Sequence, residues 1–411
     1  RGDPQTAGNM AAALAGTRAR HGARPSPVEG QAVGAGPAEP APASDDLRAA
    51  LPEDAVLVEY AFSPARGTAF VLTRQGGLER CELGLRAAGM EDLAGAWRDA
   101  LESQVRARGT ADGHGAAQAA GALQQASRSL HDALIGPVAD RLEGRRHLIV
   151  VPYGAAHALA FGALHDGTRY LVERLDVSTS VSAAVLRLCL ARATRPEGAP
   201  VVLGDDWHGR LPGCRREAVA VAEALGCTAL LDGDASTRAV RRAAAMQCTV
   251  LHVAAHGEAR LDNPLFAHIA LSDGHLTAMD AARLRLDGAL VVLSACETGR
   301  SAVVGADEVV GLSGAFLWAG ATAVVQSLWR IDDRVAEQLM TRFHAALQRG
   351  LPVAAALREA QLLRLAEPGA VVADWAPFQV TGDGAMALRG AAGPSGPGPR
   401  RPPPPTRRED G

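Results

Sequence analysis

Two segments of the sequence each end in one side chain that can do covalent chemistry. Residues 249–257 read TVLHVAAHG and residues 289–299 read ALVVLSACETG, so each is a short apolar run followed by small residues. Unbroken apolar runs bounded by glycine are typical of strands that are buried on both faces, as in a parallel sheet. In such sheets functional groups gather at the carboxyl ends of the strands. The two runs therefore predict that His256 and Cys296 meet there as a base and a nucleophile.

The distance along the chain between these two residues suits a cysteine hydrolase. The residues between His256 and Cys296 are enough for a strand end, a helix and the next strand. A cysteine hydrolase also needs hydrogen-bond donors that hold the oxyanion of the intermediate. We expect the backbone N–H groups of Gly257 and Cys296 to be those donors, because Gly257 has no side chain that obstructs a substrate.

Each of these residues also has a structural interpretation. A free cysteine is among the most buried residue types, and a histidine at a strand end is often a hydrogen-bonded core residue. His252 and His256 are four residues apart, which on a helix would place two zinc ligands on one face. The segment instead favours a strand, in which the two residues lie about 13 Å apart. We therefore expect no metal, and we expect His252 to be a packed, hydrogen-bonded strand histidine.

The chain around these residues divides into four parts. Residues 1–44 are mostly Ala, Gly, Pro and Arg and predict disorder, as does the Pro/Arg-rich segment 389–411. Residues 45–142 predict an accessory region made of a β-meander followed by helices. The expected strands of the meander are 56–60, 68–73 and 78–83, and the expected helices are 87–106 and 117–142.

Residues 143–388 predict the domain that carries the two reactive side chains. The expected strands are 148–152, 201–204, 228–231, 250–254, 269–271, 290–293 and 323–328. The expected helices are 183–193, 215–225, 237–245, 308–318, 332–349 and 352–365. Repeated strand–helix units imply right-handed crossovers and a mainly parallel sheet between helices. The predicted fold class is therefore α/β.

The composition of the chain argues against nucleic acid and membrane as binding partners. A net charge of −3 with 47% hydrophobic residues is typical of a globular protein and gives no strong field that attracts nucleic acid or an anionic membrane. No apolar run approaches the roughly 20 residues of a membrane-spanning helix. The six cysteines are scattered without a CxxC motif, which favours reduced thiols. We therefore expect a cytoplasmic protein that binds neither nucleic acid nor membrane.

An ordered series of blocks resembles the CHAT-domain family of caspase-like cysteine peptidases, which are related to separases. Besides LHVAAHG and VVLSACETG, the blocks are LIVVPYGAAHALAFGAL at 148–164, RYLVERLDVSTSVSAAVL at 169–186, LPGCRREA at 211–218, DNPLF at 262–266, LTAMD at 276–280, GADEVVGLSGAFLWAGATAVVQSLWRIDD at 305–333 and WAPFQVTGD at 375–383. The resemblance implies a caspase-like sandwich over residues 143–388, with His256 as base, Cys296 as nucleophile and no cofactor. It also implies peptide hydrolysis in a regulated protease, often beside tetratricopeptide (TPR) repeats or another sensor protein.

The sequence departs from the family pattern at two positions. The family commonly has proline after the tryptophan of the SLW motif, where this chain has Arg330, and often has Gly or Cys where this chain has Ala255. Neither difference removes the pair of reactive residues. We expect Arg330 to alter the wall of the pocket.

Acidic residues near the expected strand ends have two interpretations. Asp307 and Glu308 follow the cysteine strand, where an acidic pocket would favour Arg or Lys in the substrate; either residue could instead cap the next helix. Asp205 follows the strand at 201–204 and is the other candidate for contacting substrate, although a solvated turn is the simpler interpretation. Asp332 is expected to be a helix N-cap.

The sequence therefore predicts a cytoplasmic cysteine endopeptidase that acts on a protein or peptide. Two alternatives stay open. The first is an interaction module of the same fold with little or no turnover, and the second is a hydrolase of small molecules.

Overall fold

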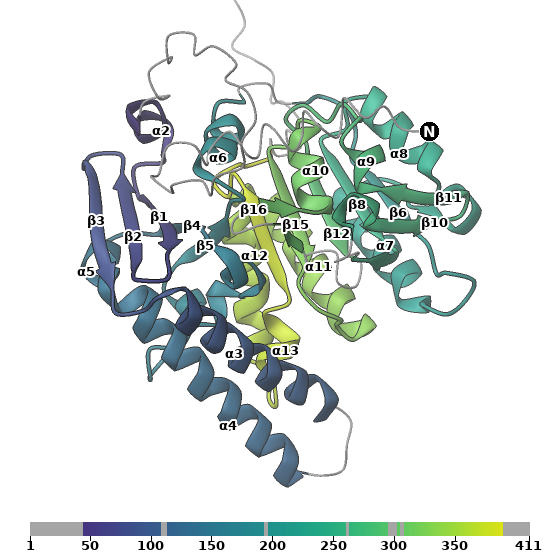
Figure 1. The fold of residues 1–411 in the computed structure, drawn as a ribbon. Coiled ribbons are helices and arrows are strands. Elements are labelled where there is room, and N and C mark those ends of the chain that lie inside the picture. The colour runs from purple at the N-terminus through teal and green to yellow at the C-terminus, as the bar shows by residue number, and fades with distance from the viewer. Residues whose placement is uncertain are drawn as a thin grey trace, which may run out of the picture.

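A long mixed β-sheet organises the molecule. The computed structural model describes residues 44–107, 113–192, 196–259, 263–294, 302–304 and 308–388. Within these residues the main sheet has eleven strands (Figure 1). Their order across the sheet is β3 (Leu78–Leu83), β2 (Gly67–Thr73), β1 (Ala55–Phe62), β4 (His147–Val151), β5 (Asp176–Thr179), β16 (Phe378–Gly382), β15 (Ala323–Ser327), β12 (Leu290–Ser294), β8 (Val250–Ala254), β6 (Val201–Gly204) and β7 (Leu230–Leu231).

The sheet consists of two parallel blocks that run in opposite directions. Strands β1, β4, β5 and β16 are parallel to one another, as are β15, β12, β8, β6 and β7. The blocks meet at the antiparallel pair β15–β16, and β2 and β3 extend the first block as an antiparallel meander. The predicted α/β class with a mainly parallel sheet is confirmed, as are the three strands of the meander.

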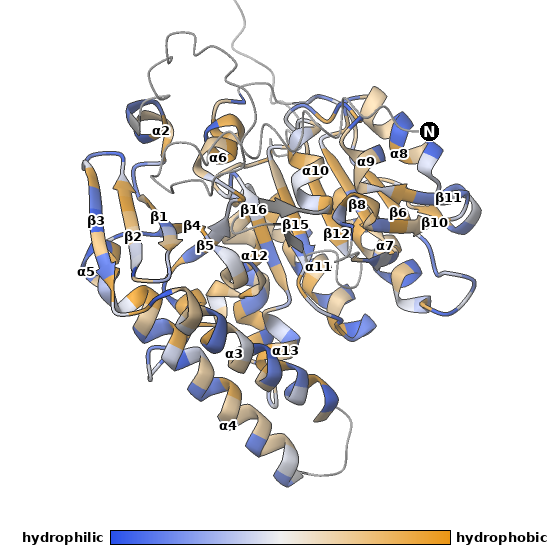
Figure 2. Cartoon of the chain, in the orientation of Figure 1, coloured by the Kyte–Doolittle hydropathy of each residue, from blue (hydrophilic) through white to orange (hydrophobic). Residues whose placement is uncertain are grey.

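Helices bury both faces of the second block. Helices α7 (Pro212–Leu225), α11 (Asp333–Gln348) and α12 (Val353–Leu365) share one apolar cluster with alternate residues of the strands, among them Val250 and Val292. Helices α8 (Thr237–Ala245), α9 (Ala278–Ala281) and α10 (Leu312–Trp318) share another cluster with the intervening residues, among them Leu251 and Val291. Figure 2 shows the resulting apolar strands at the centre of the molecule. Burial on both faces explains why these strands read as unbroken apolar runs.

A helical hairpin covers one face of the first block. Helices α3 (Ala87–Ala107) and α4 (Gly113–Leu130) lie side by side and extend beyond the sheet (Figure 1). Trp97 and Leu123 pack there with Val56 and Tyr60 of β1. On the opposite face, helices α2 (Ser44–Ala50) and α6 (Ala183–Leu190) form a smaller cluster with Leu57. After α4 the chain continues through a π-helical turn (His131–Ile135), a 3₁₀ turn (Gly136–Val138) and α5 (Ala139–Leu142).

Two expectations about local structure are corrected. The strand predicted at 269–271 is β10 (His268–Leu271), but it lies outside the main sheet, between β9 (His256–Glu258) and β11 (Gly274–Thr277) in a small antiparallel sheet. The helix predicted at 308–318 begins only at Leu312, with Gly311 as N-cap. Residues 308–310 form β14 (Glu308–Val310), which pairs with β13 (Ala302–Val304), so Glu308 does not cap this helix. The EVV sequence at 308–310 contains two β-branched residues, which favour a strand over a helix.

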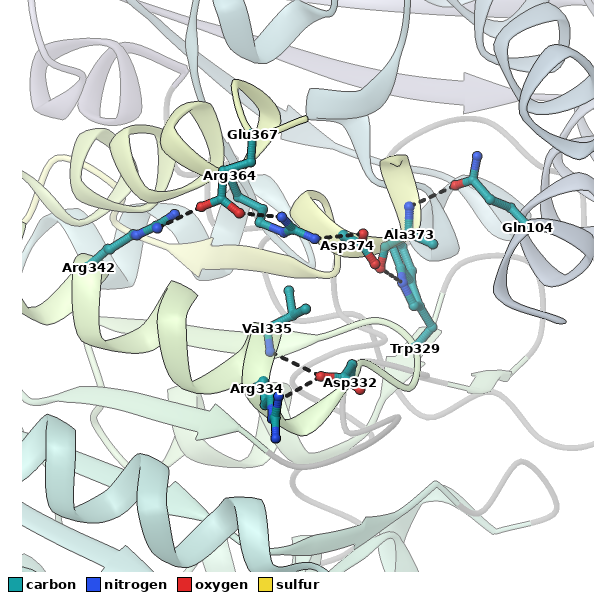
Figure 3. A network of polar contacts seen from close by, with 10 residues as sticks. All are labelled: Gln104, Trp329, Asp332, Arg334, Val335, Arg342, Arg364, Glu367, Ala373 and Asp374. Atoms are coloured by element: carbon teal, nitrogen blue, oxygen red, sulfur yellow. Dashed lines mark hydrogen bonds and ion pairs between the residues drawn. The ribbon is translucent and has the colours of Figure 1, made fainter. Parts of the chain in front are cut away.

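The predicted cap at the start of α11 is confirmed. Oδ1 of Asp332 accepts hydrogen bonds from the backbone N–H groups of Arg334 at 2.9 Å and Val335 at 3.4 Å, as Figure 3 shows. The cap satisfies two of the donors that a helix leaves free at its N-terminus.

A hydrogen-bonded chain holds the loop that follows β15 against the helical hairpin. Trp329 donates from Nε1 to the carbonyl oxygen of Ala373 at 3.1 Å, and the N–H of Ala373 donates to Oε1 of Gln104 on α3 at 2.9 Å (Figure 3). The ring of Trp329 also meets Trp97 edge-on, with centroids 6.0 Å apart. The tryptophan of the SLW motif is therefore a structural anchor, and it fixes the backbone that leads to Arg330.

Ion pairs reinforce the same region. Arg364 of α12 contacts Asp374 of α13 (Val372–Trp375) at 3.0 Å and also pairs with Glu367. Arg342 of α11 pairs with Glu367 at 2.7 Å. Figure 3 shows how this network joins the two helices to α13.

Several expectations lie outside the described residues. They include the tail at 389–411 and nearly all of the segment 1–44 for which disorder is expected; of that segment the structure describes Ser44, the first residue of α2. Of the helices that the structure does describe, none combines the length and the apolar character needed to cross a bilayer.

A buried histidine in β4 makes the stability of the fold depend on pH. Burial lowers the pKa of His147 from 6.5 to about 4, and its Nε2 lies 2.9 Å from Oγ of Ser178. Below pH 6.5 the unfolded chain binds a proton at this residue and the folded chain does not, so stability falls as the pH falls towards 4. The wild type should lose stability when the pH is lowered from 7.5 to 5. We expect the free energy of unfolding of His147→Gln to fall by about 2 kcal/mol less than that of the wild type over this range.

Urea unfolding at the two pH values measures this difference. His114→Gln, at an exposed position of α4, is the control and should lose as much stability as the wild type. If the free energy of unfolding of His147→Gln depended on pH as that of the wild type does, His147 would not be the source of the effect.

Candidate functional site

Strands β8 and β12 bring the two reactive segments to one edge of the sheet. They pair in parallel with Ala254 opposite Ser294. His256 follows Ala254 by two residues, and Cys296 follows Ser294 by two residues. Cys296 lies outside the described residues, as does Asp307. The structure thus places His256 just after the end of β8, which lies next to Ser294 at the end of β12. The cysteine segment begins after Ser294.

His256 is half-buried at the start of β9. Its ring stacks on Trp207, with centroids 4.1 Å apart and planes 8° from parallel. Burial lowers the pKa of His256 below its usual value, while Glu258 acts in the opposite direction. A neutral imidazole with a lowered pKa can accept a proton at neutral pH, as a general base must.

Basic groups surround His256. His268, Arg330 and His275 each lower its pKa further. His268 and His275 stack on each other in the small sheet, with centroids 4.0 Å apart. The ladder pairs Ala270 with both His256 and His275, so these two histidines lie on one rung of the sheet.

Asp205 holds the turn that carries Trp207. Its N–H donates to the carbonyl oxygen of Ala254 at 3.0 Å, and its Oδ1 accepts from the N–H of Trp207 at 2.8 Å. Burial raises the pKa of Asp205, and only 8% of the residue is exposed, so the expectation of a solvated turn is wrong at this position. Contact between Asp205 and a substrate stays a prediction.

Trp207 lies at the candidate site, stacked on His256, and the sequence did not predict this. It comes three residues after Gly204, where β6 ends. A Cβ at Gly204 would lie 2.5 Å from the Cβ of Ala218, so glycine there allows α7 to pack close to the strand end. The only signal in the sequence is an aromatic residue just beyond a strand that neighbours the histidine strand.

A small cavity lies beneath this edge of the sheet. Its volume is about 20 Å³, enough for about one water molecule. Ala255, Ser294 and Ser327 line it from three adjacent strand ends, together with Glu217 of α7. Gly257 lies beside this edge, buried in β9 opposite Ile269, and its role in binding the oxyanion stays a prediction.

Three buried side chains form a hydrogen-bonded chain behind the cavity. Nε2 of His252 lies 3.1 Å from Oε1 of Glu217, and Nδ1 of His252 lies 3.1 Å from Nε2 of His344 on α11. Burial lowers the pKa of His344 well below its usual value, with a further contribution from His252. His252 is therefore the packed, hydrogen-bonded strand histidine that the sequence predicts. No cluster suited to a metal ion occurs among the described residues.

The sequence profile of the CHAT domain matches residues 124–383. The chain belongs to the CHAT-domain family. Tetratricopeptide repeat protein 28 of Homo sapiens is 29% identical over 62% of this chain, and its Mus musculus counterpart is 28% identical over the same share. The chain spans 13% of the length of these curated relatives.

Solved structures with a similar fold include those of a separase complex. Two structures of the Saccharomyces cerevisiae separase–securin complex match 82% of this chain and 30% of theirs, with TM-scores of 0.58 and 0.56 at 10% and 12% identity. The arginine-specific proteinase gingipain R is more distant, with a TM-score of 0.46 at 11% identity over 73% of this chain and 76% of its own. The similarity to the separase structures confirms the caspase-like fold that the resemblance implied for this chain.

The buried Glu217–His252 pair is expected to stabilise the edge of the sheet. Glu217→Ala leaves Nε2 of His252 without its acceptor in a site with no exposure to solvent. We expect the free energy of unfolding to fall by about 3 kcal/mol, measured by chemical denaturation. Glu223→Ala, at an exposed position on the same helix, is the control, and equal stability of the two variants would contradict a role for the pair.

Proposed function

We propose that this CHAT domain is a cysteine endopeptidase in which His256 is the base and Cys296 the nucleophile. The observation that carries the proposal is the register of β8 and β12, which sets Ala254 opposite Ser294. Each reactive residue follows its member of that pair by two positions. Neighbouring strands lie about 4.8 Å apart, which is compatible with contact between an imidazole and a thiol.

The proposed reaction begins with transfer of the thiol proton of Cys296 to the neutral ring of His256. The thiolate attacks the peptide carbonyl carbon, and the N–H groups of Gly257 and Cys296 stabilise the oxyanion. The C–N bond breaks as the protonated His256 donates its proton to the leaving amine. Water, deprotonated by His256, then cleaves the thioester and releases the acid and the free thiol.

The proposed setting is a regulated signalling protease in the cytoplasm, with a protein or peptide as substrate. The curated relatives are named for tetratricopeptide repeats, which supports a repeat-containing or other sensor protein as partner. The same relatives favour a second candidate function, a CHAT-fold interaction module with little or no turnover. Peptide hydrolysis separates the two.

Cleavage of a diverse peptide library tests the enzyme directly. We expect wild type to cleave, and Cys296→Ala and His256→Ala each to lose at least about 100-fold in turnover. Cys81→Ala is the matched cysteine control because Cys81 lies in β3, at the opposite end of the sheet. Equal turnover by wild type and Cys296→Ala would reject the mechanism, and absence of cleavage by wild type would favour the interaction module. Cleavage of small esters without any peptide would indicate the small-molecule hydrolase.

The charge on Arg330 should contribute, beside burial, to the acidic limit of activity. Arg330→Gln removes a positive neighbour of His256, so the pKa of His256 rises. Because the base works in its neutral form, the acidic limb of the profile of kcat/KM against pH should move to higher pH. Arg334→Gln, at an exposed position on α11, should leave the limb where it is. A limb that does not move in Arg330→Gln would exclude this effect.

A further inference from the structure

An indole covers one face of the candidate base. Trp207 and His256 stack nearly in parallel at 4.1 Å, closer than the usual separation of about 4.5 Å or more between aromatic rings. The two residues come from different elements: Trp207 follows β6, and His256 follows β8. Because Gly204 pairs with Ala254, the stacked residues extend from adjacent strand ends.

The turn that carries the indole has an unusual backbone. Trp207 has φ +49° and His208 has φ +59°, in the left-handed region that residues other than glycine rarely adopt. Such conformations cost on the order of 1–3 kcal/mol each and persist only where surrounding contacts hold them. Outliers of this kind gather at functional sites, so a strained tryptophan against a histidine calls for a functional explanation.

Specific contacts hold this turn in place. The carboxylate of Asp205 accepts the N–H of Trp207 at 2.8 Å, and Asp206 accepts the N–H of Gly209 at 2.8 Å. The backbone N–H of Leu211 donates to the carbonyl oxygen of Asp206 at 2.8 Å. The turn is therefore fixed to the sheet at one end and closed on itself at the other.

A cation adds to the support of the indole. The guanidinium carbon of Arg210 lies 5.0 Å from the centroid of the Trp207 ring, within the range of a cation–π contact. The indole thus contacts both Arg210 and the imidazole. Its orientation is set by the backbone, by the Asp205 hydrogen bond and by this contact.

We propose that Trp207 is the positioning residue of His256, and that its stacked indole fixes the plane of the imidazole for proton transfer. This inference rests on the proposed function. Proton transfer to and from a ring nitrogen requires the acceptor lone pair to lie in the direction of the reacting group, and that direction lies in the plane of the ring. A ring that rotates freely about its last side-chain torsion spends most of its time in unproductive orientations. Stacking on the indole restricts that freedom before the substrate binds.

The stacking interaction also makes a prediction that does not depend on turnover. Trp207→Ala exposes one face of the imidazole to water, so the effect of burial on the pKa of His256 is reduced and the pKa rises. NMR of histidine-labelled protein in a Cys296→Ala background measures this titration directly. Trp207→Phe keeps an aromatic face and should stay near the parent value. The exposed Trp318 on α10 supplies the control variant Trp318→Ala, which should leave the titration unchanged.

Kinetics distinguish a positioning role from simple packing. In the active protein we expect Trp207→Ala to lower kcat by about 10- to 100-fold with little change in KM. The acidic limb should move to higher pH, and Trp207→Phe should recover most of the rate. Asp205→Ala, which removes the acceptor of the Trp207 N–H, should lower kcat in the same way, whereas Asp205→Asn keeps an oxygen at that position and should do so less.

The outcomes separate this inference from the proposed function. Wild-type protein that cleaves no peptide rejects the function, while the titration of His256 still shows whether Trp207 controls the ring. Active protein in which Trp207→Ala changes neither kcat nor the titration overturns the positioning role and leaves the peptidase intact. Thermal melts confirm that the compared variants are folded.

Discussion

The parallel pairing of β8 with β12 is the constraint on which the candidate site depends. Both strands are buried along their whole length, and alternate residues enter different apolar clusters on the two faces of the sheet. A slip of one residue would exchange the faces and mismatch both clusters at once. The pairing of Ala254 with Ser294 is therefore fixed by the packing of the whole block, and the relation between His256 and the cysteine segment depends on that pairing.

Several strands and helices of the second block could be predicted because their burial determines the order of apolar residues in the sequence. The strand at 250–254 and the helix at 237–245 have the bounds that the sequence predicts, since apolar runs and helical periodicity record which faces are buried. No local pattern in the sequence indicates that β16 runs antiparallel to β15. Nor does one indicate β5 and β9, which are short and partly polar. Their place depends on distant strands, and a local pattern does not encode distant partners.

The residues of the candidate site differ in how much the local sequence says about their surroundings. His256 ends an apolar run, whereas Trp207 acquires its role from a left-handed turn on a neighbouring strand. Asp205 follows a strand end, where a solvated turn is the simpler expectation, yet the turn that it holds buries it. The hydrogen-bonded side chains of Glu217, His252 and His344 connect two helices through a strand. Such contacts exist only once the elements have packed.

A neutral His256 and an acidic substrate pocket require opposite charges near this edge of the sheet. Burial lowers the pKa of His256, and among the described residues His268, Arg330 and His275 lower it further while Glu258 raises it, so the balance favours the neutral base. A pocket for Arg or Lys would need negative charge nearby, and negative charge close to the imidazole would raise its pKa. The carboxylate of Asp205 is buried and already accepts a hydrogen bond from its own turn. A basic substrate residue and a neutral base are compatible only if the pocket lies far enough from His256 for solvent to screen the two.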